Sequence, residues 1–200
     1  MIAEVGGETM DGGDGTDTLD LTRWNGTYAV NMVTGASSWG GELYTNFENL
    51  NSGDGDDSIT GTSDANVINT NGGNDTIDAG GGADTVNAGT GNDHVIDSDF
   101  VSFDVYDGGD GVDWIDYSNV TFSDGYVSIN LGTGVTSVTV GNTETISNFE
   151  NASGSQGGET ITGSGADNIL YGNGGNDTLY GNNGNDTLDG GSGADTMDGG

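Results

Sequence analysis

The stretch "GNGGNDTLYGNNGNDTLDGGSGADTMDGG" at residues 172–200 writes nearly the same nine residues three times. Each copy opens with six residues rich in Gly, Asn and Asp, and it closes with three residues such as "TLY" or "TLD". Gly, Asn and Asp favour turns with positive φ, whereas Thr, Leu and Tyr suit a pleated strand. We therefore expect each unit to form one tight turn followed by one short strand.

A large aliphatic residue recurs every nine positions in two arrays of five units each. The first array has Ile59, Ile68, Ile77, Val86 and Val95, and the second has Ile161, Leu170, Leu179, Leu188 and Met197. Two units stand alone, "GGDGTDTLD" at 12–20 and "GGDGVDWID" at 108–116. A fixed short period of this kind predicts a solenoid in which each repeat buries its apolar residue against its neighbours.

The expected coil contains two units, eighteen residues in all. Successive side chains of a strand point to opposite faces, so the aliphatic residue faces inward while its two neighbours face water. Strand, turn, strand and turn then complete one coil of a flattened parallel roll. Alternate turns consequently stack along the same edge.

A longer repeat contains the short one. The tetrapeptide "NFEN" occurs at 46–49 and at 148–151, each time between a lone unit and a five-unit array. We therefore divide the chain into an N-terminal tail (1–11), a first module (12–97), a connector (98–107) and a second module (108–200). Gly199 and Gly200 begin another unit, which leads us to expect that this sequence is a segment of a larger polypeptide.

The charge balance limits the possible partners. Acidic residues number 33 against a single Lys or Arg, and the formal net charge is −32. Nucleic acids and anionic membrane surfaces both require basic side chains, so this segment is expected to bind neither. A chain so acidic and so poor in large apolar residues is typical of disorder unless a cation compensates the charge.

An acid or amide stands two residues before each aliphatic position, and we identify these side chains as candidate metal ligands. They are Asp17, Asp57, Asn66, Asp75, Asp84, Asp93, Asp113, Asn168, Asp177, Asp186 and Asp195, with Glu159 as a longer variant. Stacked strands lie about 4.7–4.9 Å apart. Two carboxylates at ~5 Å repel each other by about 3 kcal/mol at an effective dielectric constant near 20.

Calcium is the ion that this spacing favours. Its oxygen ligands lie about 2.3–2.6 Å away, so one ion between adjacent turns would convert repulsion into attraction. Magnesium requires octahedral geometry at about 2.0–2.1 Å and suits the gap poorly. The sequence therefore predicts several bound Ca²⁺ ions.

The consensus G-G-x-G-x-D-x-U-x, where U is a large aliphatic residue, resembles the haemolysin-type calcium-binding repeat of the RTX family. "GGDGTDTLD", "GGDGVDWID" and "GGSGADTMD" match it at every fixed position. The resemblance implies an all-β fold, a right-handed parallel β-roll, within a secreted bacterial protein that is exported unfolded by a type I machine. It also implies that turn carbonyls share the ion with the Asp; here these are Gly55, Gly73, Gly82, Gly91, Gly175, Gly184 and Gly193.

The two linkers, which include residues 24–35 and 126–151, have the alternating pattern of strands. We expect them to continue the roll as irregular β coils, with Trp24, Trp39, Phe47, Trp114 and Phe149 in a larger core. Antiparallel hairpins beside the roll are the alternative. The Phe of "NFEN" is expected to cap the mouth of each array, as solenoids require.

The residue types give little support for a catalytic site. His94 is the only histidine and cysteine is absent, so we expect His94 to be an ordinary surface residue and the segment not to be an enzyme. The leading hypothesis is calcium-dependent folding of a secreted protein. The alternative is a calcium-dependent adhesin or a carbohydrate-binding module attached to an extracellular enzyme, with an extracellular polysaccharide as its partner.

Overall fold

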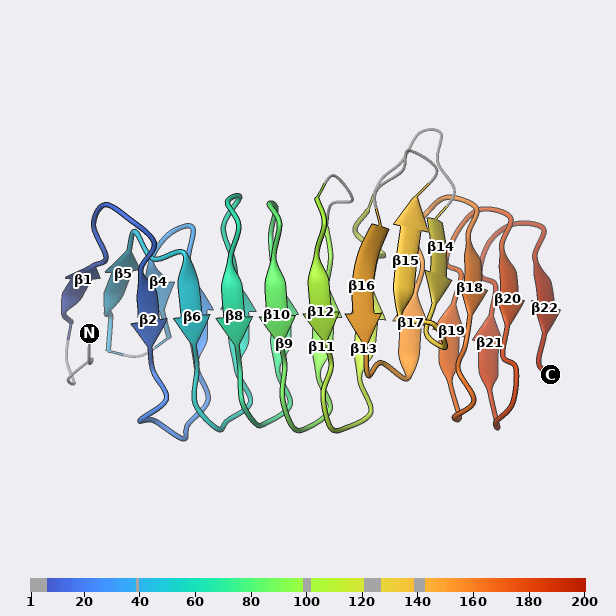
Figure 1. Ribbon diagram of the computed structural model, residues 1–200, viewed down its shortest axis with the longest axis horizontal. Helices are drawn as coiled ribbons and strands as arrows, with labels where there is room; N and C mark the ends of the chain where they lie inside the picture. The colour runs from blue at the N-terminus through green and yellow to red at the C-terminus, as the bar shows by residue number, and fades with distance from the viewer. Residues whose placement is uncertain (1–6, 39, 99–101, 121–126, 139–142) are drawn as a thin grey trace.

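The computed structural model describes residues 7–38, 40–98, 102–120, 127–138 and 143–200. These residues form an all-β solenoid of two sheets, each with eleven strands, and they contain no helix. The two sheets lie face to face along the length of the molecule, and the first and last strands, β1 (Thr9–Asp11) and β22 (Thr196–Asp198), lie at opposite ends of it (Figure 1). Within the described residues, nothing resembles a helix of the length and apolarity that a bilayer crossing needs.

Short strands alternate between the two sheets as the chain advances. The first sheet contains, in spatial order, β1 (Thr9–Asp11), β5 (Leu43–Thr45), β4 (Ala36–Ser37), β3 (Ala29–Asn31), β7 (Ser58–Thr60), β9 (Thr76–Asp78), β11 (His94–Ile96), β13 (Trp114–Asp116), β17 (Asn151–Ser153), β19 (Ile169–Tyr171) and β21 (Thr187–Asp189). The second contains β2 (Thr18–Asp20), β6 (Asn49–Asn51), β8 (Val67–Asn69), β10 (Thr85–Asn87), β12 (Val105–Asp107), β16 (Thr143–Ser147), β15 (Val135–Val138), β14 (Val127–Asn130), β18 (Thr160–Thr162), β20 (Thr178–Tyr180) and β22 (Thr196–Asp198).

The register within the arrays is parallel and advances by eighteen residues per coil. Ser58 pairs with Thr76 between β7 and β9, and Thr178 pairs with Thr196 between β20 and β22. The middle residue of each three-residue strand points inward, so that Ile59, Ile77 and Leu179 are almost fully buried. The predicted parallel β-roll is therefore confirmed.

A coil of different length joins the first array to the second linker. Strand β12 lies between β10 and β16, and Thr85 pairs with Val105, which is twenty residues further along the chain. Tyr106 takes the inward position and is almost fully buried. The sequence pattern missed this strand because Tyr106 follows Val95 by eleven residues rather than nine.

The linkers continue the two sheets as expected, but as antiparallel strands rather than as coils, so the coil expectation is wrong and neither linker packs beside the roll. Strands β3, β4 and β5 form one antiparallel group within the first sheet, and β14, β15 and β16 form another within the second. The first turn is closed by Asn31, whose Oδ1 accepts the amide of Thr34 at 2.8 Å, and Gly35 follows with φ 72°. Asn130 and Thr133 repeat the bond at 2.9 Å.

These antiparallel groups remain part of the roll. The last strand of each group pairs with the coil before it, while the first strand pairs with the coil after it, as β3 does with β7 and β14 with β18. The two sheets therefore run through both linkers without a break in strand pairing.

The aromatic residues divide between the interior and the surface. Phe47 and Phe149 are buried, and Trp24 packs against the core at partial exposure. Trp114 lies on the outer face of β13, with its ring centroid 5.3 Å from that of Tyr171, so the expectation that it joins the core is wrong. Trp39 falls outside the described residues.

The "NFEN" tetrapeptides are turns inside the stack rather than caps at its mouth. Asn46 and Asn148 have φ values of 56° and 57°, the left-handed conformation that a turn glycine usually provides. The strands that follow, β6 and β17, each have a neighbouring strand on both sides. The expectation of a cap is therefore wrong.

Gly91→Ala should destabilise the folded, calcium-saturated protein by more than about 1 kcal/mol. Gly91 has φ 131°, and a Cβ there would overlap the carbonyl oxygen of Gly73 in the adjacent coil. Gly165→Ala is the matched control, because a Cβ at Gly165 meets no atom within 4 Å. Thermal unfolding of both variants is the measurement, and equal midpoints would contradict the close stacking of these turns.

Candidate metal sites in the stacked turns

The turn acids point into the roll rather than out to solvent. Of the candidate side chains, Asp57, Asn66, Asp75, Asp84, Asp93, Asp113, Asn168 and Asp177 are buried, as is Glu159. Asp17, Asp186 and Asp195 lie nearer the ends of the stack and are partly exposed. The acids therefore belong to the interior of the turns, where a charge requires compensation.

One carboxylate oxygen of each acid ties its coil to the preceding one. The Oδ1 atom of Asp75 accepts the backbone amide of Asp57 at 2.8 Å, and Oδ1 of Asp93 accepts that of Asp75 at 2.8 Å. The same bond recurs in both arrays at the following pairs: Asn66 to Asp84, Asp84 to Asp104, Asp93 to Asp113, Glu159 to Asp177, Asn168 to Asp186 and Asp177 to Asp195. These bonds fix the stacking of the turns along each of the two edges of the roll.

The second carboxylate oxygen is left for another partner. The Oδ2 atoms of Asp17, Asp93, Asp113 and Asp186 are buried and accept no hydrogen bond within the described structure. A buried charged oxygen without a partner is strongly unfavourable, so this chemistry fits a bound cation.

In the turns, carbonyl oxygens of glycine lie close to the Oδ2 atom of the acid. A Cβ built on Gly172 would overlap Oδ2 of Asp177 and would lie 2.7 Å from the carbonyl oxygen of Gly190 in the next coil. At Gly181 the same two kinds of oxygen, from Asp186 and Gly199, converge in the same way. Carboxylate and carbonyl oxygens are the ligands that calcium prefers. The carbonyls at this first position of the repeat were missed by the sequence reasoning.

The glycine carbonyls that the resemblance implied stack in columns along the edges of the roll. A Cβ on Gly91 or Gly193 would overlap the carbonyl oxygen of Gly73 or Gly175, respectively, in the preceding coil. The glycines at this position have φ values between 107° and 146°; they are Gly73, Gly82, Gly91, Gly175, Gly184 and Gly193, and Gly55 precedes Gly73 in the same column. The absence of side chains here lets the carbonyls approach the next turn.

Asn66 and Asn168 use their amides for hydrogen bonds between coils. The Nδ2 group of Asn66 donates to the carbonyl of Glu48 at 2.7 Å, and its Oδ1 accepts the amide of Thr62 at 2.7 Å. Asn168 makes the equivalent bonds to Glu150 and Ser164. At these two positions an amide N–H donor lies where the other turns present a carboxylate oxygen.

Burial raises the pKa of the turn acids when no cation is bound. It raises the pKa of Asp75 to about 7 and that of Asp113 to about 6, against hydrogen bonds from the backbone that lower both. The pKa values of Asp93 and Asp177 are raised by burial as well. The folded turns thus disfavour the ionised carboxylates, unless a cation compensates them.

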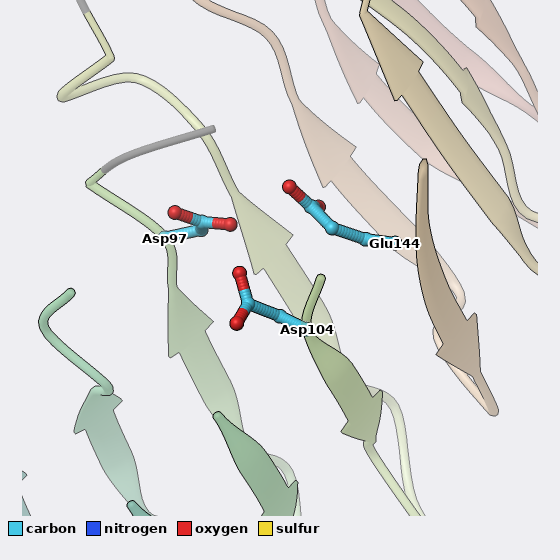
Figure 2. A group of neighbouring side chains, drawn as sticks. All are labelled: Asp97, Asp104 and Glu144. Atoms are coloured by element: carbon cyan, nitrogen blue, oxygen red, sulfur yellow. The ribbon is translucent and has the colours of Figure 1, made fainter. Parts of the chain in front are cut away.

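One acidic group lies outside the repeat pattern. Asp97, Asp104 and Glu144 are buried, and Figure 2 shows their carboxylates facing one another from three segments of the chain. One oxygen from each lies within 4.8 Å of the others. The sequence reasoning missed this group because Glu144 comes from the linker, far from the other two in sequence.

The lone histidine is partly exposed, as expected, and it makes a surface contact. Nε2 of His94 lies 3.0 Å from Oδ2 of Asp116 on the neighbouring strand. Although burial opposes the effect, hydrogen bonds from His94 and Ser118 hold the pKa of Asp116 below its ordinary value.

Comparison with protein families finds one match. The family described as the RTX calcium-binding nonapeptide repeat matches residues 3–21, 47–74, 60–95, 153–188 and 171–200, which together cover more than half of the chain. Residues 96–152 lie outside the matched ranges. They include Asp97, Asp104 and Glu144, the acidic group of Figure 2. No curated protein matches the chain significantly.

Asp113→Asn should weaken calcium binding about tenfold, equivalent to about 1.4 kcal/mol. The substitution removes the charge of a buried carboxylate whose Oδ2 has no hydrogen-bond partner. Asp110→Asn changes the same charge in the same turn, but the Asp110 side chain is exposed. Isothermal titration with calcium measures both variants, and equal affinities would mean that Asp113 is not a ligand.

Proposed function

The chain belongs to the family of RTX calcium-binding nonapeptide repeat proteins, and from this premise we propose that calcium filling its turns drives the folding of the roll. Its repeats bind several calcium ions, as the family does. The observation that supports calcium-dependent folding is the buried Oδ2 atom without a hydrogen-bond partner, which recurs in turn after turn.

We propose that each ion is held by the turn acid together with carbonyl oxygens of the stacked turns. The acids of this set are Asp17, Asp57, Asp75, Asp84, Asp93, Asp113, Asp177, Asp186 and Asp195. Asn66 and Asn168 contribute less, because their amides already bond to Glu48 and Glu150 of the preceding coil. The ion compensates the charge that the protein interior otherwise disfavours.

Ligand binding to the folded form alone supplies the driving force. Each site contributes RT ln(1 + [L]/Kd), about 2.7 kcal/mol when calcium is at 100 times its Kd. Neighbouring sites share a stack of turns, so ordering one turn prepares the next for its ion. The transition with calcium concentration should consequently be steep.

We propose a secreted protein as the setting for this switch, since proteins with RTX repeats are typically secreted. A chain of net charge −32 stays open where calcium is scarce and folds where calcium is abundant, as outside the cell. In this proposal the modules 12–97 and 108–200 are structural segments of a larger, type I-exported polypeptide. The RTX repeat is a structural, non-enzymatic unit, and we assign no catalysis to this segment.

A second candidate function has one specific observation behind it. An open hollow of about 520 Å³ on the outer face of the first sheet is lined by His94, Trp114, Asp116 and Tyr171, among others. The rings of Trp114 and Tyr171 are tilted by 31° and present apolar surface beside polar groups. Such a surface suits a sugar ring, so an extracellular polysaccharide is the proposed ligand of this alternative.

Calcium titration of the chelated protein should convert coil to sheet cooperatively, whereas magnesium at equal concentration should not. The physical reason is the larger coordination shell of calcium, which the carboxylate and carbonyl oxygens of two stacked turns can fill. Far-UV circular dichroism is the measurement. Full sheet content in excess chelator at neutral pH would contradict the proposal.

Acidification should partly replace calcium. The pKa of Asp75 is about 7 when folded, above the unfolded value of about 3.9, so the folded form binds more protons between these values. Stability of the calcium-free form therefore rises as pH falls from about 7, and it is lost as pH rises. Circular dichroism in chelator at pH 5 and pH 8 measures this effect, and less sheet at pH 5 would contradict it.

The polysaccharide alternative makes a separate prediction. If Trp114 forms a sugar-binding surface, a glycan array with calcium present should show binding by the wild type and a loss of at least tenfold for Trp114→Ala. Val112→Ala is the control, because Val112 lines the same hollow without a ring. No binding by the folded wild-type protein would exclude this function for the segment.

A further inference from the structure

Three buried carboxylates meet where the first array adjoins the second linker. Asp97 directly follows β11, Asp104 directly precedes β12, and Glu144 lies in β16 of the second linker. All three side chains are at most 2% exposed. The close-up in Figure 2 shows that they point toward a common space between the three segments.

Hydrogen bonds hold two of these carboxylates in place. Oδ1 of Asp104 accepts the backbone amide of Asp84 at 2.7 Å, the bond that the turn acids make throughout the arrays. Oε2 of Glu144 accepts the hydroxyl of Tyr117 at 2.8 Å, and Tyr117 is itself fully buried. The acids are therefore positioned before any ligand arrives.

Glu144 also has an oxygen without a hydrogen-bond partner. Its Oε1 is buried and accepts no hydrogen bond within the described structure, whereas its Oε2 accepts the hydroxyl of Tyr117. The chain's only Lys or Arg is Arg23, which is exposed and lies near Asp20. Arg23 therefore compensates Asp20 rather than this group.

We propose that Asp97, Asp104 and Glu144 form a buried calcium site that is separate from the consensus turns and joins the second linker to the first array. Three oxygens about 2.4 Å from a central calcium ion lie at most about 4.8 Å apart. One oxygen from each carboxylate lies within 4.8 Å of the other two, a span that a single calcium ion can bridge.

Electrostatics support the same conclusion. Burial, and then the nearby charge of Asp97, raises the pKa of Glu144 to about 9. Three carboxylates in a dry interior cannot all be ionised unless a cation lies among them. A divalent ion meets that condition and also crosslinks three segments that are distant in sequence.

The first linker provides a matched comparison. Glu42 occupies the place of Glu144 relative to "NFEN", it is buried, and it accepts the hydroxyl of Tyr44. Leu43 donates its amide to the carbonyl of Glu8, as Thr145 does to Asp104. Within the described residues, however, only the second linker brings three acids together.

Equilibrium dialysis of the full chain against radioactive calcium tests the site. Glu144→Gln and Asp97→Asn should each bind one ion fewer than the wild type, whereas Glu42→Gln should bind the wild-type number. Circular dichroism in saturating calcium confirms folding, and Asp97→Asn decides the matter if Glu144→Gln does not fold. An unchanged number of ions in either folded variant would overturn the site.

Failure of the three-carboxylate site can be distinguished from failure of calcium-dependent folding by the turns. If the wild type gains no sheet with calcium, calcium-dependent folding fails whatever the dialysis shows. If the wild type folds with calcium and the folded variants keep every ion, only the three-carboxylate site fails.

Discussion

The fold depends on a carboxylate buried between two stacked turns. One oxygen of Asp75, Asp93 or Asp113 accepts a backbone amide from the preceding coil, which aligns the turns. The other oxygen of Asp93 or Asp113 faces the interior without a hydrogen-bond partner. The hydrogen bond specifies the stacking, and the oxygen without a partner is unfavourable in the stacked state unless a cation compensates it. In the proposed function, folding and calcium binding are therefore linked through the same side chain.

The close stacking of the turns also explains why the chain is so rich in glycine. The turns approach so nearly that a Cβ at Gly91, Gly175 or Gly193 would overlap the backbone of the adjacent coil. Each strand is only three residues long in the arrays, so one aliphatic side chain per strand reaches the core. Such a thin core supplies limited apolar burial, which is why the proposed function assigns a large share of the stability to the ions.

Two departures from the repeat pattern have structural roles. Asn66 and Asn168 replace a charged acid with an amide that donates to the preceding coil, so that a hydrogen bond holds the turns beside both "NFEN" segments. The longer coil through Tyr106 shifts the register to twenty residues and brings Asp97 and Asp104 to Glu144. Both departures occur where an array meets a linker.

The sequence by itself determined the strand positions of the arrays, the inward aliphatic residues, the stacking by eighteen and the calcium chemistry. Local preferences decide all of these, because turn formation and strand alternation involve residues close together in the chain. Only the tertiary structure decided the antiparallel linkers, the outward Trp114, the inward acids and the meeting of Asp97 with Glu144. These features depend on pairing between distant segments, and a residue's own neighbours in sequence do not specify such pairing.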